Sequence, residues 1–205
     1  MSIKKVHFIS GMIVTAFVGL HLFNHISSIF GAEMHVTLMN TLRRFYRNMF
    51  VEIVLLLALS VKILSGFIQI LIRKRNAWNT IDKWQVWTGG YLAFFIIFHV
   101  GVVFVGRFYL LLDTNYYFGA AGLNSFPTNL FFVPYYTFAI ISFFGHIATI
   151  HYKKMKLNVL GLSPAKQSKI ILVMGICITL ITFFGLTNHF RGVKIPTEYH
   201  VLIGK

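Results

Sequence analysis

The sequence predicts an all-α integral membrane protein, a bundle of five transmembrane helices forming a single membrane domain over residues 1–205. Hydrophobic residues make up 57% of the chain and charged residues only 12%, whereas a water-soluble domain carries about 25% charged residues. Nearly all the lysines and arginines flank apolar stretches, as in membrane proteins. Although the formal net charge is +14, this composition excludes a solvated nucleic-acid-binding domain, and we expect a lipid membrane and no nucleic acid as partner.

Five apolar segments are long enough to cross about 30 Å of hydrocarbon as helices that rise about 1.5 Å per residue. They cover approximately residues 8–30, 49–72, 88–112, 131–152 and 169–188. The first follows the basic pair Lys4 and Lys5, as a signal peptide would. We interpret it as a retained helix, because His21, Asn24 and His25 stand where a cleavage site would be.

Two of the connecting segments have readable patterns. Residues 33–48 place apolar residues at helical spacing beside basic ones, which predicts an amphipathic helix at the membrane interface. Residues 115–129 are rich in Gly, Asn and aromatic residues, which predicts a surface loop.

The distribution of basic residues predicts an up-down topology with the amino terminus in the cytoplasm. Eleven basic residues fall on the amino-terminal side and seven on the opposite side. The eleven are Lys4, Lys5, Arg73, Lys74, Arg75, Lys83, Lys153, Lys154, Lys156, Lys166 and Lys169. The remaining basic residue, Lys62, lies inside a predicted span.

Several ionisable side chains fall inside predicted spans, where each is costly and needs a partner or a task. They are His21, His25, Glu52, Lys62, His99 and His146. Depth counted along the helices groups His21 with His99 in one layer and His146 with Lys62 in another. Two histidines from different helices at one depth suit axial ligation of a b-type haem. Alternatively, these histidines only form hydrogen bonds between helices.

Four stretches in order resemble the single-chain, five-helix cytochrome b subunits that anchor succinate dehydrogenases and fumarate reductases of the menaquinone-linked, dihaem type. The first helix of that family resembles SGMIVTAFVGLHLFNH at residues 10–25, and the second resembles VEIVLLLALSVKILSG at 51–66. The third resembles TGGYLAFFIIFH at 88–99 and the fourth SFFGH at 142–146, followed by SPAKQSK at 163–169 before the last helix.

The resemblance implies a haem-b-binding membrane anchor that passes electrons between a partner dehydrogenase or reductase and a membrane quinone. The partners would be flavoprotein and iron–sulfur subunits on the cytoplasmic face of a bacterial inner membrane. His21 and His99 would ligate the iron of the outer haem, and His146 would hold an inner haem. The family has histidine where this chain has Lys62, whose amine can ligate iron only without its proton. We therefore expect one haem b and leave a second open.

The resemblance also implies a quinone site near the outer haem, beside Glu52. Asn24 and His25 lie one turn beyond His21, where a quinone headgroup or the haem propionates would sit. Glu52 would be the catalytic group that relays protons to or from the quinone oxygens. The alternative for Glu52 is a helix-end side chain that extends to the membrane interface or pairs with Arg43, Arg44 or Arg47. Five other histidines receive no role: His7, His35, His151, His189 and His200.

Two other functions stay open. The chain could be a stand-alone membrane protein of the same fold that has lost part or all of its haem and binds a quinone, a lipid or a protein. A transporter is the weaker alternative, because there is no inverted repeat and no proline breaks a span in mid-membrane. The single cysteine, Cys177, excludes disulfides within the chain and iron–sulfur ligation, so we expect no complete enzyme.

Overall fold

The computed structural model describes residues 1–72 and 78–205, and within this part of the chain it contains helices and no β-strand. Among the described residues, five helices are long and apolar enough to cross a membrane, as predicted, so the chain is a multi-pass membrane protein. Arg73, Lys74 and Arg75, which contribute to the charge count above, lie outside the described residues.

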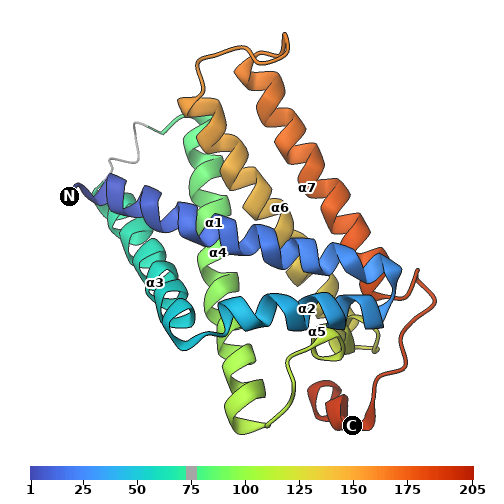
Figure 1. Ribbon diagram of the computed structural model, residues 1–205. Helices are drawn as coiled ribbons and strands as arrows, with labels where there is room; N and C mark the ends of the chain where they lie inside the picture. Colours follow the sequence, from blue (N-terminus) through green and yellow to red (C-terminus); the bar gives the residue numbers. More distant parts are fainter. Residues whose placement is uncertain (73–77) are drawn as a thin grey trace.

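The helices follow one another along the chain as shown in Figure 1. They are α1 (Ile3–Ser27), η1 (Ser28–Phe30), α2 (Ala32–Tyr46), α3 (Met49–Ile72), α4 (Thr80–Phe104), the π-helical turn η3 (Val105–Tyr109), α5 (Tyr116–Leu123), α6 (Asn129–Lys154), α7 (Pro164–Leu186) and η4 (Thr197–Ile203). Helix α2 covers most of residues 33–48, for which an amphipathic helix was predicted.

Polar caps mark the beginning of two of the spanning helices, α4 and α7. Helix α4 starts at Thr80, earlier than predicted, because Asn79 Oδ1 accepts the Asp82 N–H at 2.8 Å and the Asp82 carboxylate accepts the Asn79 N–H at 3.2 Å. This reciprocal capping box satisfies backbone groups at the helix end. Likewise α7 begins at Pro164, with Ser163 as its cap, and proline is favoured at a first helical position.

The prediction of a surface loop at 115–129 is wrong for its first part, which forms helix α5. Tyr116, Ala120 and Leu123 are buried there in a small core, and the Tyr116 hydroxyl donates to the Gly185 carbonyl oxygen of α7 at 3.2 Å. The aromatic and glycine residues that suggest a loop in the sequence serve packing here. Asn115 caps the helix by accepting the Tyr117 N–H at 2.9 Å.

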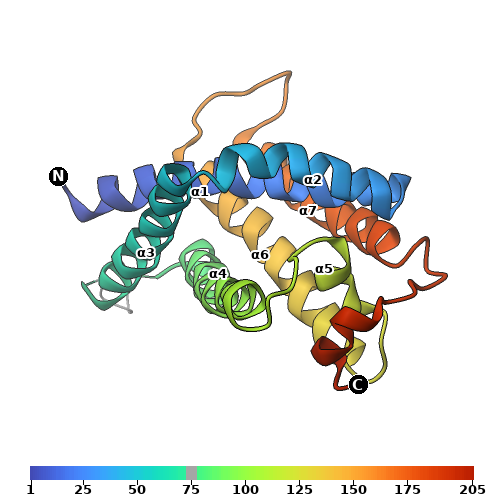
Figure 2. The same ribbon diagram turned by 60° about the horizontal axis from the view of Figure 1, so that its bottom comes forward.

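The long helices pack in pairs that leave space between them. Helix α1 packs along α3, α4 packs along α6, and α6 packs along α7, whereas α3 and α4 touch at few places in the described chain. Figures 1 and 2 show α1 and α2 side by side, lying across α4 and α6. A cavity lies between the pair α1–α3 and the pair α4–α6.

Candidate functional site

A cavity of about 1360 Å³ runs between the two helix pairs. Its wall is mostly apolar and includes five histidines: His7, His21, His25, His99 and His146. Lys4, Lys153 and Lys154 contribute to the lining, as do Arg43, Arg47 and Arg107. Pockets for small organic ligands have volumes of about 300–1,000 Å³, so this cavity has room for a large flat macrocycle.

His21 on α1 and His99 on α4 come together across this cavity. Their ring centres are 6.1 Å apart and their planes are inclined by 67°. The His99 ring stacks on Phe95 at 5.0 Å, and within the described chain it makes no hydrogen bond. A nitrogen ligand lies about 2 Å from a transition metal, and a ring centre lies roughly 1 Å farther, so two imidazoles on one iron have centres about 6 Å apart. The spacing fits a shared iron.

His25 lies one turn after His21 and forms a hydrogen bond with its Nε2, the nitrogen that would ligate iron. The two Nε2 atoms are hydrogen-bonded at 3.2 Å, and His25 Nδ1 is buried without a partner among the described residues. A ligand that takes the His21 nitrogen therefore has to displace His25.

Asn24 does not line the cavity, although it was predicted to contact a quinone; its amide donates to His35 Nε2 at 3.1 Å. His35, on α2, was given no role, yet it is only 2% exposed. Burial, followed by the charges of His21 and Arg43, lowers the pKa of His35 to about 4. The sequence did contain a sign of this burial, because His35 is four residues before Met39, which is also buried, and so lies on the same face of the helix.

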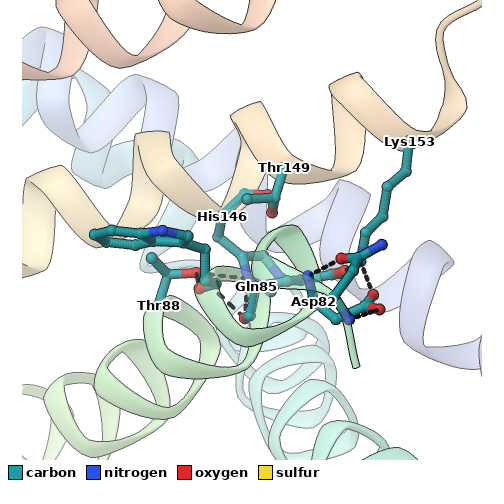
Figure 3. A network of polar contacts seen from close by, with 8 residues as sticks. Asp82, Gln85, Thr88, His146, Thr149 and Lys153 are labelled. Atoms are coloured by element: carbon teal, nitrogen blue, oxygen red, sulfur yellow. Dashed lines mark hydrogen bonds and ion pairs between the residues drawn. The ribbon is translucent and has the colours of Figure 1, made fainter. Parts of the chain in front are cut away.

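The second predicted layer contains His146, Lys62 and also His7. The His146 Nδ1–H donates to the Gln85 carbonyl oxygen at 3.2 Å and lies 3.3 Å from the Thr88 hydroxyl (Figure 3). The Lys62 ammonium donates to the His7 carbonyl oxygen at 3.1 Å, and in the described chain it has no hydrogen bond to His146. His7 Nδ1 lies 2.9 Å from the Ser65 hydroxyl.

An ion pair ties α6 to α4 beside this layer. Lys153 Nζ contacts Asp82 Oδ1 at 2.5 Å and also the Gln85 side-chain oxygen (Figure 3). Because Asp82 is only 4% exposed, its charge is held away from bulk water and depends on such partners.

Glu52 pairs with Arg107 and not with Arg43, Arg44 or Arg47, so that predicted pairing is wrong. Arg107 Nη1 donates to Glu52 Oε1 at 2.5 Å. Arg43 is engaged elsewhere, since it donates to Asp113 Oδ1 at 2.6 Å. Arg107 was missed because it lies in η3, a π-helical turn at which helical spacing shifts.

Comparisons of this chain with protein-family models, with curated proteins and with solved structures find no match.

Proposed function

We propose that this chain is a haem-b-binding membrane subunit that passes electrons between a dehydrogenase or reductase of the succinate/fumarate type and a membrane quinone. The observation that carries the proposal is the 6.1 Å separation of the His21 and His99 rings across a cavity large enough for a macrocycle. His21, on α1, and His99, on α4, would hold the haem iron. A bound haem b supplies reversible one-electron chemistry, and the chain supplies its position and surroundings.

The wall of the cavity supports this assignment. It is largely apolar, which suits a macrocycle. Gly90 lies on the wall, and a Cβ at this position would meet no atom within 4 Å, so the space beside α4 is open here. His99 is held against Phe95 and keeps its nitrogens free of other hydrogen bonds in the described chain.

In this proposal the amino terminus lies in the cytoplasm of a bacterium, the helices alternate up and down through its inner membrane, and Lys4, Lys153 and Lys154 lie near the cytoplasmic face. That basic face suits flavoprotein and iron–sulfur partners. The quinone binds where His25 and Glu52 line the cavity. There Glu52 exchanges protons with the quinone oxygens. Asn24 acts indirectly, because its amide donates a hydrogen bond to His35.

The test is the haem content of protein purified in mild detergent after haem-sufficient expression. We expect His21→Ala and His99→Ala each to lose the haem that these residues share. His189→Ala is the matched control, because His189 is exposed and contacts the Ile29 carbonyl oxygen outside the cavity. Unchanged haem content in both His21→Ala and His99→Ala would contradict the proposal.

A second candidate is a stand-alone membrane protein of this fold that binds a quinone, a lipid or a protein without haem. The hydrogen bond between His25 and His21 favours it, because that bond satisfies the His21 nitrogen within the chain. A folded wild-type sample that contains no haem would support this candidate.

A further inference from the structure

The Lys62 ammonium lines the cavity and uses only one of its three N–H donors within the described chain. It donates to the His7 carbonyl oxygen at 3.1 Å. A Cβ at Gly11 would lie 2.6 Å from Lys62 Nζ, so the ammonium rests directly against α1 where that helix has no side chain. No described carboxylate pairs with Lys62, although a charge inside a span is costly without a partner.

A second ammonium, that of Lys154 on α6, contacts the next residue of α1. Lys154 Nζ lies 3.9 Å from the centre of the Phe8 ring, which is a cation–π contact. It forms no ion pair or hydrogen bond within the described chain. Lys4 lies one turn before Phe8 on α1 and also lines the cavity. Three cations from three helices therefore gather at the amino-terminal end of α1.

The acidic residues of the chain do not neutralise these three lysines. The whole sequence contains five aspartates and glutamates. Three of them form ion pairs with arginines or with Lys153. The other two, Glu33 and Glu198, do not line the cavity. An anion that compensates the charge at this end of the cavity has to come from outside the chain.

The wall beside the three lysines is apolar and suits a hydrocarbon chain. Met12 on α1 and Phe67 on α3 line the cavity and are exposed, and Ile147 of α6 contributes to the same wall. Helices α3 and α4 touch at few places in the described chain, so helix packing does not close this side of the cavity. Acyl chains surround a spanning helix at this depth, so a lipid has lateral access to the wall.

We propose that this end of the cavity binds an anionic phospholipid, with its phosphate at Lys62 and Lys154 and an acyl chain along Met12 and Phe67. Basic pockets between transmembrane helices recognise anionic headgroups in this way. The site goes beyond the proposed function and does not depend on haem. His7 precedes His21 by fourteen residues of α1, which corresponds to about 21 Å along the helix, so the lipid and the proposed haem occupy different levels.

The experiment counts lipid adducts by native mass spectrometry while dioleoyl phosphatidylglycerol is titrated into the full-length protein in mild detergent. Wild type is expected to bind one such lipid, and to bind zwitterionic dioleoyl phosphatidylcholine about tenfold more weakly. Lys62→Met and Lys154→Met are each expected to weaken phosphatidylglycerol binding about fivefold, the contribution of one basic residue near an anionic lipid. Lys156→Met is the matched control, because it removes the same charge from an exposed residue that does not line the cavity.

Two further arms separate the lipid site from a simple anion site and from the haem site. Inorganic phosphate is expected not to displace phosphatidylglycerol, because it has no acyl chain for the apolar wall. His21→Ala is expected to lose the haem of the proposed function and to retain the lipid, so the two proposals fail separately. Should Lys62→Met not fold, Lys154→Met decides the matter, since Lys154 is exposed.

The inference is overturned if Lys154→Met binds phosphatidylglycerol as tightly as wild type, or if Lys156→Met loses as much affinity as Lys154→Met. Displacement of the lipid by inorganic phosphate would show that the apolar wall holds no acyl chain. A lipid that binds only when haem is absent would lie at the level of His21 and not at that of Lys62.

Discussion

Arg107 donates a hydrogen bond to the carboxylate of Glu52 at 2.5 Å, and this ion pair joins the π-helical turn η3 to α3. Helices α3 and α4 have few other contacts in the described chain. The ion pair therefore links two sides of the cavity that have few other contacts with each other in the described chain.

We expect Arg107→Gln to lower the stability of the protein and Glu52→Gln to have a smaller effect once Arg107 is absent. The side chains are 21% and 26% exposed, so a coupling free energy of about 1 kcal/mol is expected from partly screened charges. Thermal unfolding of wild type, both single variants and the double variant in one detergent measures it. Strict additivity of the two changes would show that the pair does not stabilise the fold.

The close approach of α7 to η1 requires glycine at position 185. A Cβ there would lie 2.7 Å from the Ile29 backbone nitrogen, which cannot move away as a flexible side chain could. Gly185→Ala is expected to destabilise the protein by about 2 kcal/mol through overpacking. Gly19→Ala is the control, since a Cβ at Gly19 meets no atom within 4 Å. Equal unfolding temperatures for the two variants would contradict this account.

We expect Lys153 to stabilise the fold, because its ammonium compensates the charge of the buried Asp82 carboxylate. Lys153→Met removes that cation and is predicted to cost about 2 kcal/mol, the order expected when a buried charged group loses a partner. Lys153→Arg keeps the charge and should retain much of the stability. The exposed Lys156 provides the control variant Lys156→Met. Unfolding midpoints in detergent are measured for Lys153→Met, Lys153→Arg and Lys156→Met. A loss of stability in Lys156→Met as large as that in Lys153→Met would reject a specific role for the ion pair.

His35 gives the protein a pH-dependent stability. Burial lowers its pKa from 6.5 to about 4 in the folded state, so between these values the unfolded chain binds a proton that the folded chain does not. Stability contributed by neutral His35 is therefore complete above pH 6.5 and declines as the pH falls toward 4. The slope approaches about 1.4 kcal/mol per pH unit within that range.

His35→Gln keeps a polar side chain beside Asn24 but cannot take up the proton. We expect this variant to depend less steeply on pH than wild type across the same range. Unfolding curves at a series of pH values measure both slopes. Parallel curves would mean that His35 is not held neutral by burial.

The five spanning helices could be predicted from the sequence because length and apolar composition suffice for them. Amphipathic spacing was also enough for α2. The beginning of α4 could not be predicted from hydropathy, because it depends on a capping box between the polar residues Asn79 and Asp82. For α5, composition was misleading, since the same Gly and aromatic residues pack a buried helix.

Depth along the helices predicted that His21 and His99 share a level, and the structure brings their rings to 6.1 Å. Counting residues along a helix gives the depth of a side chain in the membrane but not the direction in which it points around the helix axis. It therefore missed that Asn24 turns away toward His35 and that Lys62 turns toward His7. The role of Arg107 depends on the π-helical turn, which has no clear signature in this sequence.

The measurement that tests the central claim most directly is a pyridine haemochrome assay with a reduced-minus-oxidised spectrum. It is made on full-length wild-type protein purified in mild detergent after haem-sufficient expression. The account predicts a b-type spectrum and at least one haem per chain, lost when His21 or His99 is replaced. A folded, helical sample that contains no haem would contradict it.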